Sequence, residues 1–407
     1  MFEGHPGSQV TWERLRSGFA ADHIDGFVDW LHRHGYRPAT IDATLRSLAG
    51  WPDCMRTTRF TVHDLVAIFE SRTAELKSDY HGPISYATAG AALFIRFLRE
   101  QGVLPPPAAR PSPSDIWPIV GEFRSWMRQH RGLTETTLDV YQAIVVELLA
   151  GVGGDTRIYT AEALRSFVLE RACRYGCQRA KTVVVSVRAF LRFLGATGQC
   201  PEGMHHTIPG FAARQLSTIP RFLVAEDVER VIASCPVGTK GLRDKAVLLL
   251  LARLGLRAGE VAGLKFSDID WANGHITVCG KGRRQELLPL PQEVGDALLS
   301  YLQRSRPLLR TPELFVSVVA PFRSLTRAAV TRVVRRALHR AGIKAPINGA
   351  HVLRHSAATA MLRQGASLAG IGAVLRHHSP TTTAHYAKVD FGLLSEIAQP
   401  WPTVPSC

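Results

Sequence analysis

The stretch HVLRHSAATAMLRQGASLAGIGAVLRHHSPTTTAHY, residues 351–386, carries the chemistry around which the rest of the chain is organised. His351 and Arg354 are three residues apart, a spacing that places both side chains on one face of a helix. A second basic group, Arg-His-His at 376–378, precedes Tyr386, and the Ser-Pro-Thr-Thr-Thr run between them can begin a short helix. An arginine fork binds two phosphate oxygens at once, and a tyrosine hydroxyl can act as a covalent nucleophile. These residues predict a phosphoryl-transfer site that works without a metal.

The same stretch resembles the motifs of a known protein family. HVLRH matches the His-x-x-Arg-His pattern of the tyrosine recombinase (phage integrase) family, and LRHHSPTTTAHY matches its Leu-Gly-His pattern with a tyrosine nine residues after the histidine. Two further signatures, GLRAGEV at 255–261 and GKGRRQELLPL at 280–290, lie upstream in the order typical of the family. Four ordered matches are far more specific than any single motif.

The chain departs from the family pattern at Arg376, where glycine is usual. His378 is then an alternative to His377 as the working imidazole, although the count of nine residues to Tyr386 favours His377.

The resemblance implies a catalytic set of six side chains: Arg257, Lys281, His351, Arg354, His377 and Tyr386. The tyrosine is expected to attack the scissile phosphate and to remain attached to its 3′ side while a 5′-hydroxyl leaves. His351 is the expected base, the two arginines would bind the non-bridging oxygens, His377 would donate a further hydrogen bond, and Lys281 would protonate the leaving oxygen. No cofactor is expected.

Arg257 and Glu260 also allow a less specific interpretation. Two charged residues three apart at the edge of an apolar helix can form a surface ion pair worth under about 1 kcal/mol. The alternative is that Glu260 supports the site by orienting the Arg257 fork towards a phosphate. The family resemblance favours the second interpretation.

His351 and His355 also allow a metal site, because histidines four residues apart on a helix can share a metal ion. A zinc protease motif would require glutamate at 352, where this chain has Val352. We therefore expect no metal, and we expect His355 to hydrogen-bond within its own domain.

The chain is strongly basic, with a net charge of +15 over 407 residues. Residues 221–390 hold 25 Lys and Arg against 12 Asp and Glu, which leaves +13 in this region. Such an excess predicts a polyanionic partner, and the longest apolar run, residues 246–252, is too short to span a membrane. Four arginines in the helical pattern of 326–342 are expected to bind DNA phosphates: Arg327, Arg335, Arg336 and Arg340. Seven scattered cysteines suit a reducing cytosol, so a cytoplasmic, nucleoid-associated location is expected.

The first 200 residues contain an internal repeat. Four residue types recur at a constant offset of 96: Phe27 and Phe123, Trp30 and Trp126, His34 and His130, Thr40 and Thr136. We interpret 1–104 and 115–200 as two copies of one module of about four amphipathic helices. The proline-rich stretch 103–115 and the stretch 198–210 are expected to be linkers.

The expected fold is mainly α, with a small β-sheet from the runs 276–279 and 285–290 in the last domain, residues 218–400. The resemblance implies SAM-like helical modules followed by a tyrosine recombinase catalytic domain. It also implies that the second module clamps DNA as a core-binding domain. The first module is an addition to that plan, either a further arm on the DNA or a contact between subunits.

These expectations converge on a site-specific recombinase or integrase of a mobile genetic element, acting on double-stranded DNA recombination sites. The resemblance implies a homotetramer, or a hetero-assembly with related recombinases, on two duplexes. The apolar segment FGLLSEI, residues 391–397, either docks on a neighbouring subunit or packs on its own domain. A type IB topoisomerase, which uses the same residue set as a monomer, and a catalytically inactive DNA-binding relic are the alternatives.

Overall fold

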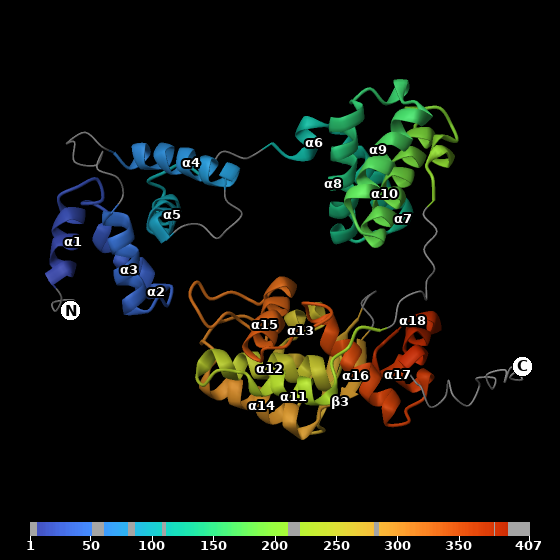
Figure 1. The fold of residues 1–407 in the computed structure, drawn as a ribbon. Coiled ribbons are helices and arrows are strands. Elements are labelled where there is room, and N and C mark those ends of the chain that lie inside the picture. The colour runs from blue at the N-terminus through green and yellow to red at the C-terminus, as the bar shows by residue number, and fades with distance from the viewer. Residues whose placement is uncertain are drawn as a thin grey trace, which may run out of the picture. The chain divides into compact units, whose positions relative to one another are not determined.

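The computed structural model describes residues 6–50, 61–79, 86–107, 111–210, 220–280, 285–377 and 379–389 (Figure 1). The chain divides into two compact units, residues 107–217 and residues 1–106 together with 218–407. The described residues are mostly helical with one small sheet, which confirms the predicted fold class. No helix in this part of the chain combines the length and apolar character needed to cross a bilayer.

The first module consists of helices whose apolar faces meet in one core. They are α1 (Pro6–Arg16), α2 (Ile24–Arg33), α3 (Pro38–Ala49), α4 (Val62–Asp79) and α5 (Tyr86–Glu100). Phe27 of α2 and Phe94 of α5 are fully buried at its centre. The indole of Trp30 donates a 2.8 Å hydrogen bond to Glu100, so the amphipathic tryptophan is satisfied at the edge of the core.

The second module repeats this arrangement. It contains α6 (Pro113–Ile116), α7 (Pro118–Arg131), α8 (Glu135–Val152), η2 (Thr156–Ile158), α9 (Ala161–Arg174), α10 (Cys177–Ala196) and η3 (Met204–Thr207). Phe27 and Phe94 make an edge-to-face contact with ring centroids 5.1 Å apart, and Phe123 and Phe190, each 96 residues later, make the same contact at 5.3 Å.

A second matched contact involves the repeated tryptophan and histidine. The Nδ1 atom of His34 is 2.8 Å from the Trp30 carbonyl oxygen, and the Nδ1 atom of His130 is 3.0 Å from the Trp126 carbonyl oxygen. The two modules thus share aromatic and polar contacts at the offset of 96 residues.

The segment 198–210 was predicted to be a linker, and this prediction is wrong. Ile208 is 1% exposed and belongs to the core of the second module, and Arg188 donates a 2.8 Å hydrogen bond to its carbonyl oxygen. Gly198 and Gly203 adopt positive φ angles, which lets the chain turn back onto α10. The glycines and prolines mark turns correctly, but they do not reveal the apolar side chains that anchor the segment.

The third set of elements forms the domain that carries the sequence motifs. It contains α11 (Ala225–Ala233), α12 (Thr239–Arg253), α13 (Ala258–Gly263), η4 (Phe266–Asp268), β1 (Ile269–Asp270), β2 (His275–Cys279), β3 (Gln285–Pro289), α14 (Gln292–Arg304), α15 (Arg327–Arg340), α16 (His351–Arg363), α17 (Leu368–Val374), α18 (Pro380–Ala384) and η5 (His385–Val389). Helix α12 is buried almost all round, with Leu248 to Leu251 fully enclosed, so it forms the centre around which the other elements pack.

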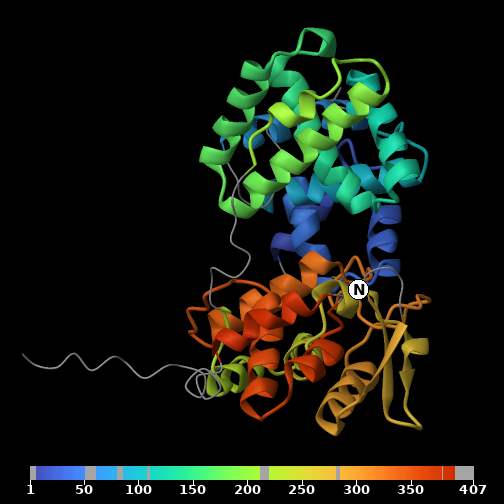
Figure 2. The same ribbon diagram turned by 90° about the vertical axis from the view of Figure 1, so that its right-hand side faces the viewer.

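The sheet is antiparallel with strand order β1-β2-β3, and its strands are drawn in gold in Figure 2. Ile276 pairs with Leu288 and Cys279 with Gln285, so the two predicted strands are present and pair with each other. Lys281 falls in the connection between them and lies outside the described residues, as do His378 and the segment 391–397.

Candidate active site

Gly255 begins the first part of the site, just after α12. Its φ of 58° is the left-handed conformation that glycine often adopts just after a helix end. A Cβ atom at this position would also come within 2.5 Å of Leu375, so both backbone and space require glycine. The carbonyl oxygen of Gly255 accepts a hydrogen bond from the buried guanidinium of Arg354.

Arg257 and Glu260 form a fixed pair at the start of α13. The Glu260 carboxylate accepts the backbone N–H of Arg257 at 2.7 Å and its side-chain Nη1 at 2.6 Å. Burial alone would raise the pKa of Glu260, but the hydrogen bond from the Arg257 backbone and the charges of Arg376 and Arg257 hold it below its ordinary value. The Glu260 side chain is only 5% exposed, so this is not an ordinary surface ion pair.

Arg376 explains how the chain tolerates its departure from the family pattern. Its φ is 55°, the left-handed region that favours glycine. Its guanidinium is 2% exposed and forms a 2.9 Å ion pair with Glu260, while its carbonyl oxygen accepts a 3.1 Å hydrogen bond from Arg257. One carboxylate therefore neutralises one buried cation, Arg376, and orients a second, Arg257, which keeps part of its surface open.

Arg354 lies where three distant motifs meet. It is 3% exposed, and its guanidinium donates to the carbonyl oxygens of Gly255 and Leu375. Burial, followed by the charges of Arg257 and Arg376, lowers the pKa of Arg354 to about 10, so it remains a cation at neutral pH. The segments around residues 255, 354 and 375 are thereby joined through one side chain.

His351 is the first residue of α16 and stays partly exposed. It lines a cleft of about 480 Å³ together with Arg257, Glu260, Cys279 and Arg327. Partial burial, followed by the charges of Arg354, Arg327 and Arg257, lowers the pKa of His351. His351 is therefore a neutral imidazole that can accept a proton, and the neighbouring arginines can bind an anion in the same cleft.

His377 and Tyr386 lie side by side. Their rings are parallel, with centroids 6.3 Å apart, and the Nδ1 atom of His377 is 2.8 Å from the Thr383 hydroxyl. Burial and the charge of Arg354 lower the pKa of His377 to about 4. When Nδ1 accepts a hydrogen bond from the Thr383 hydroxyl, the ring proton resides on Nε2, the atom that the predicted phosphate contact would use.

Tyr386 is 2% exposed, and its ring packs among Ala358, Leu362, Ile371 and Leu375. Burial raises its pKa to about 12, and the charge of Arg354 offsets part of that rise. The hydroxyl is 2.8 Å from the Nδ1 atom of His355. The predicted internal hydrogen bond of His355 thus exists, and its partner is the candidate nucleophile, which no sequence motif indicates.

The four arginines predicted to bind phosphate have different surroundings. Arg327 begins α15, capped by the Thr326 hydroxyl, and lines the cleft. Arg335 and Arg336 are exposed on the same helix. Arg340 donates a 2.9 Å hydrogen bond to the Ser234 carbonyl oxygen. Arg327 is thus the one of the four that reaches the cleft.

A metal site does not form among the described residues, which contain no group of three or more His, Cys, Asp or Glu suited to hold an ion. The rings of His351 and His355 stack with centroids 5.7 Å apart. His355 uses its Nδ1 atom towards Tyr386.

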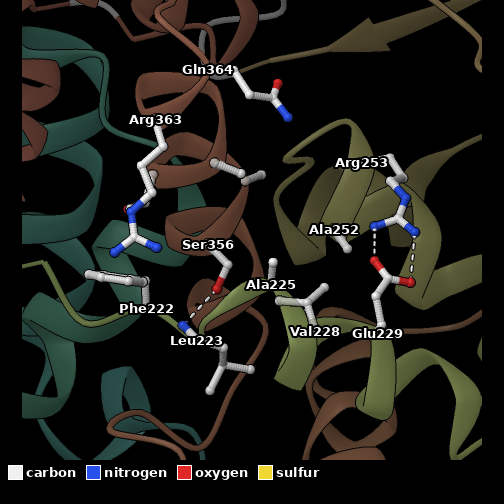
Figure 3. Close-up of a pocket in the computed structure, with 13 residues that line it drawn as sticks. Phe222, Leu223, Ala225, Val228, Glu229, Ala252, Arg253, Ser356, Arg363 and Gln364 are labelled. Atoms are coloured by element: carbon white, nitrogen blue, oxygen red, sulfur yellow. Dashed lines mark hydrogen bonds and ion pairs between the residues drawn. The ribbon is translucent and has the colours of Figure 1, made fainter.

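A second pocket lies on the opposite face of α16 and is mostly apolar (Figure 3). Ser356 accepts a 2.8 Å hydrogen bond from the Leu223 backbone, and the Arg363 guanidinium lies 5.1 Å from the Phe222 ring centroid. Ser356 and Arg363 point away from the face that carries His351 and Arg354 because of the helical period. This pocket is therefore separate from the cleft that His351, Arg257 and Arg327 line.

Comparisons with known proteins agree with this arrangement. Residues 221–392 match the model of the phage integrase family. The chain is 35% identical over 396 residues to "Putative integrase/recombinase y4rA" of Sinorhizobium fredii, covering 96% of each chain. It is 27% identical over 281 residues to the tyrosine recombinase XerD of Listeria monocytogenes, covering 67% of this chain and 94% of the relative.

The fold is similar to that of solved recombinases. A crystal structure of the XerH site-specific recombinase bound to palindromic difH substrate, a post-cleavage complex, aligns with a TM-score of 0.57 at 19% identity, covering 82% of this chain and 94% of that one. A λ integrase dimer bound to a COC′ core site aligns with a TM-score of 0.54 at 18% identity, covering 70% and 98%. With the sequence motifs, the geometry and full-length similarity in agreement, the chain belongs to the phage integrase family of tyrosine recombinases.

Proposed function

We propose that this protein is a site-specific DNA recombinase or integrase of a mobile genetic element, which cuts and rejoins strands through a 3′-phosphotyrosyl intermediate. The observation that supports this most strongly is the position of Arg354. Its buried guanidinium joins the Gly255 loop to the Leu375 turn, and its charge acts on the hydroxyl of Tyr386, the candidate nucleophile.

The reaction begins when a phosphodiester enters the cleft beside Arg257. The Tyr386 oxygen attacks phosphorus, a bond forms between them, and the bond from phosphorus to the 5′-oxygen breaks. The tyrosine proton passes to His351 as base, and Lys281 supplies a proton to the leaving 5′-oxygen. A 5′-hydroxyl from a partner duplex then attacks the phosphotyrosine and reverses these steps with exchanged strands.

Electrostatic stabilisation supplies most of the rate in this scheme. Arg257 and Arg354 face the charge that builds on the non-bridging oxygens, and His377 adds a neutral donor. Removing one such preorganised donor typically costs about 3 to 4 kcal/mol of barrier. Because Glu260 holds Arg257 before DNA arrives, little reorganisation is needed when the phosphate enters.

Double-stranded DNA is the proposed partner. The net charge of +13 over residues 221–390 favours binding to a phosphate backbone, and the similar XerH and λ integrase structures contain their DNA sites. Strand exchange requires two duplexes, so we propose a tetramer, or a hetero-assembly with related recombinases. The alignment with y4rA extends over the first module as well, which supports a recombinase over a minimal topoisomerase.

A nicked suicide duplex made from the DNA that flanks the gene tests this function. The wild-type protein should form a covalent adduct that resists SDS, and Tyr386→Phe should abolish the adduct while retaining DNA binding. Tyr301→Phe is the matched control, because Tyr301 is the other fully buried tyrosine described in this domain. Relaxation of a supercoiled plasmid with no recombinant product would indicate a topoisomerase, and binding with no adduct would indicate an inactive relic.

A further inference from the structure

His355 of α16 lies within hydrogen-bond distance of the hydroxyl of the candidate nucleophile, Tyr386. Its Nδ1 atom lies 2.8 Å from the Tyr386 hydroxyl oxygen, and the two ring centroids are 5.7 Å apart with an interplanar angle of 56°. The contact joins α16 to η5, 31 residues later in the chain. The mechanism proposed above assigns no role to this histidine.

The surroundings of Tyr386 make this hydrogen bond important. Four apolar residues from α16, α17 and the turn after α17 enclose the tyrosine ring, so the hydroxyl is the polar end of an otherwise buried side chain. A buried phenol needs a hydrogen-bond partner, and an unsatisfied hydroxyl would seek another rotamer or a water molecule. His355 therefore determines where the oxygen points before DNA binds.

Both members of this hydrogen bond are uncharged at neutral pH. Burial, followed by the charges of His351, His385 and Arg354, lowers the pKa of His355 to about 4. Burial raises the pKa of Tyr386 to about 12. The phenol therefore keeps its proton at neutral pH. In the Nε2–H tautomer of the neutral imidazole, Nδ1 accepts a hydrogen bond from this hydroxyl, so His355 holds the hydroxyl without ionising it.

His355 lies on the same face of α16 as the residues that border the cleft. His355 follows His351 by four residues, and their rings stack with centroids 5.7 Å apart. His351 lines the phosphate cleft. Arg354, the adjacent residue, is close enough for its charge to act on the Tyr386 hydroxyl. The hydrogen bond thus holds the oxygen on the α16 face that carries both the expected base and a phosphate-binding cation.

We propose that His355 is a positioning residue for the nucleophile, which aims the neutral Tyr386 hydroxyl at the entering phosphodiester through its Nδ1 atom. This inference rests on the proposed function. The two can be tested separately, because a protein without the His355 imidazole would still cleave DNA, only more slowly.

The test compares His355→Leu, which removes the acceptor, with His355→Asn, which can present an amide oxygen near the position of Nδ1. Single-turnover adduct formation is measured on the suicide duplex at saturating DNA, alongside the Kd for the same DNA. His355→Leu should slow adduct formation by about 10- to 100-fold with little change in Kd, and His355→Asn should recover part of the rate. His385→Asn, in the residue adjacent to Tyr386, is the control and should retain the wild-type rate.

NMR spectroscopy of the histidine nitrogens tests the hydrogen bond directly, also in the case that His355→Leu does not fold. In protein labelled with ¹⁵N-histidine, His355 should show an unprotonated, hydrogen-bonded Nδ1 and a protonated Nε2, and Tyr386→Phe should shift the Nδ1 signal. An unchanged signal, or wild-type or faster adduct formation by folded His355→Leu, overturns the inference. Absence of an adduct in the wild-type protein would instead count against the proposed function.

Discussion

Glu260→Gln tests the charge arrangement of the site. The substitution keeps the size of the side chain but removes the negative charge that Arg257 and Arg376 share. The Arg376 guanidinium and the Glu260 carboxylate are 2% and 5% exposed, so the loss leaves a buried cation uncompensated. Removing one partner of a buried ion pair typically costs about 3 to 5 kcal/mol. Arg257 adds less, because water reaches its side chain, which is 31% exposed.

The expected result is a loss of about 3 to 5 kcal/mol in the free energy of unfolding of the catalytic domain. For a domain of this size, each kcal/mol corresponds to roughly 2 to 4 °C in Tm. Differential scanning calorimetry of the full chain should therefore show a shift of about 10 °C in one transition. Adduct formation should also fall at least about tenfold, because the Arg257 fork loses its orienting partner.

Arg376→Gly is the matched comparison. It removes the other member of the buried pair, but Glu260 keeps both hydrogen bonds from Arg257. Glycine also relieves the left-handed backbone at φ 55°, a gain of about 1 to 2 kcal/mol. We expect Arg376→Gly to lower the free energy of unfolding by at most about 2 kcal/mol, which is clearly less than the loss for Glu260→Gln. Equal losses for the two variants, or a neutral Glu260→Gln, would refute this reasoning.

Three further predictions follow from the same geometry. Gly255→Ala should lower the free energy of unfolding in urea by about 1 to 3 kcal/mol, because residue 255 has a positive φ and the added methyl group would clash with Leu375. Gly259→Ala is the control and should be close to neutral, because nothing lies within 4 Å of a Cβ atom at that position. Folding lowers the pKa of His355 to about 4, from about 6.5 in the unfolded chain. Its stabilising contribution is therefore complete above the unfolded pKa and is lost as the pH falls through the folded pKa. The Tm of the wild type should therefore fall more steeply over this range than that of His355→Asn, and parallel curves would contradict the assignment. Arg327→Gln should slow adduct formation as well as weaken DNA binding, whereas Arg336→Gln should only weaken binding; equal adduct rates at saturating DNA would place Arg327 outside the reaction.

Sequence reasoning succeeded where the determinant is local. The spacing of His351 and Arg354 predicts a shared helix face, and α16 begins at His351. The runs 276–279 and 285–290 predict a small sheet, and β2 and β3 form there. In each case a short-range rule of backbone geometry fixes the outcome.

It failed where the determinant is a contact between distant residues. No spacing rule connects Glu260 to Arg376, which are 116 residues apart, or shows that a carboxylate would serve two arginines. The partner of His355 was equally hidden, because only the fold brings η5 against α16. The burial of Ile208, which makes 198–210 part of a module, is also a tertiary property.

The identity of the atom that bonds to DNA provides the most direct test of the account. After trapping on a suicide duplex and digestion with protease and nuclease, mass spectrometry should find a nucleotide linked through its 3′-phosphate to the peptide that contains Tyr386, and the released strand should carry a free 5′-hydroxyl. A nucleotide on another residue, or linkage through a 5′-phosphate, would contradict the central claim that the cations around Arg354 serve this hydroxyl.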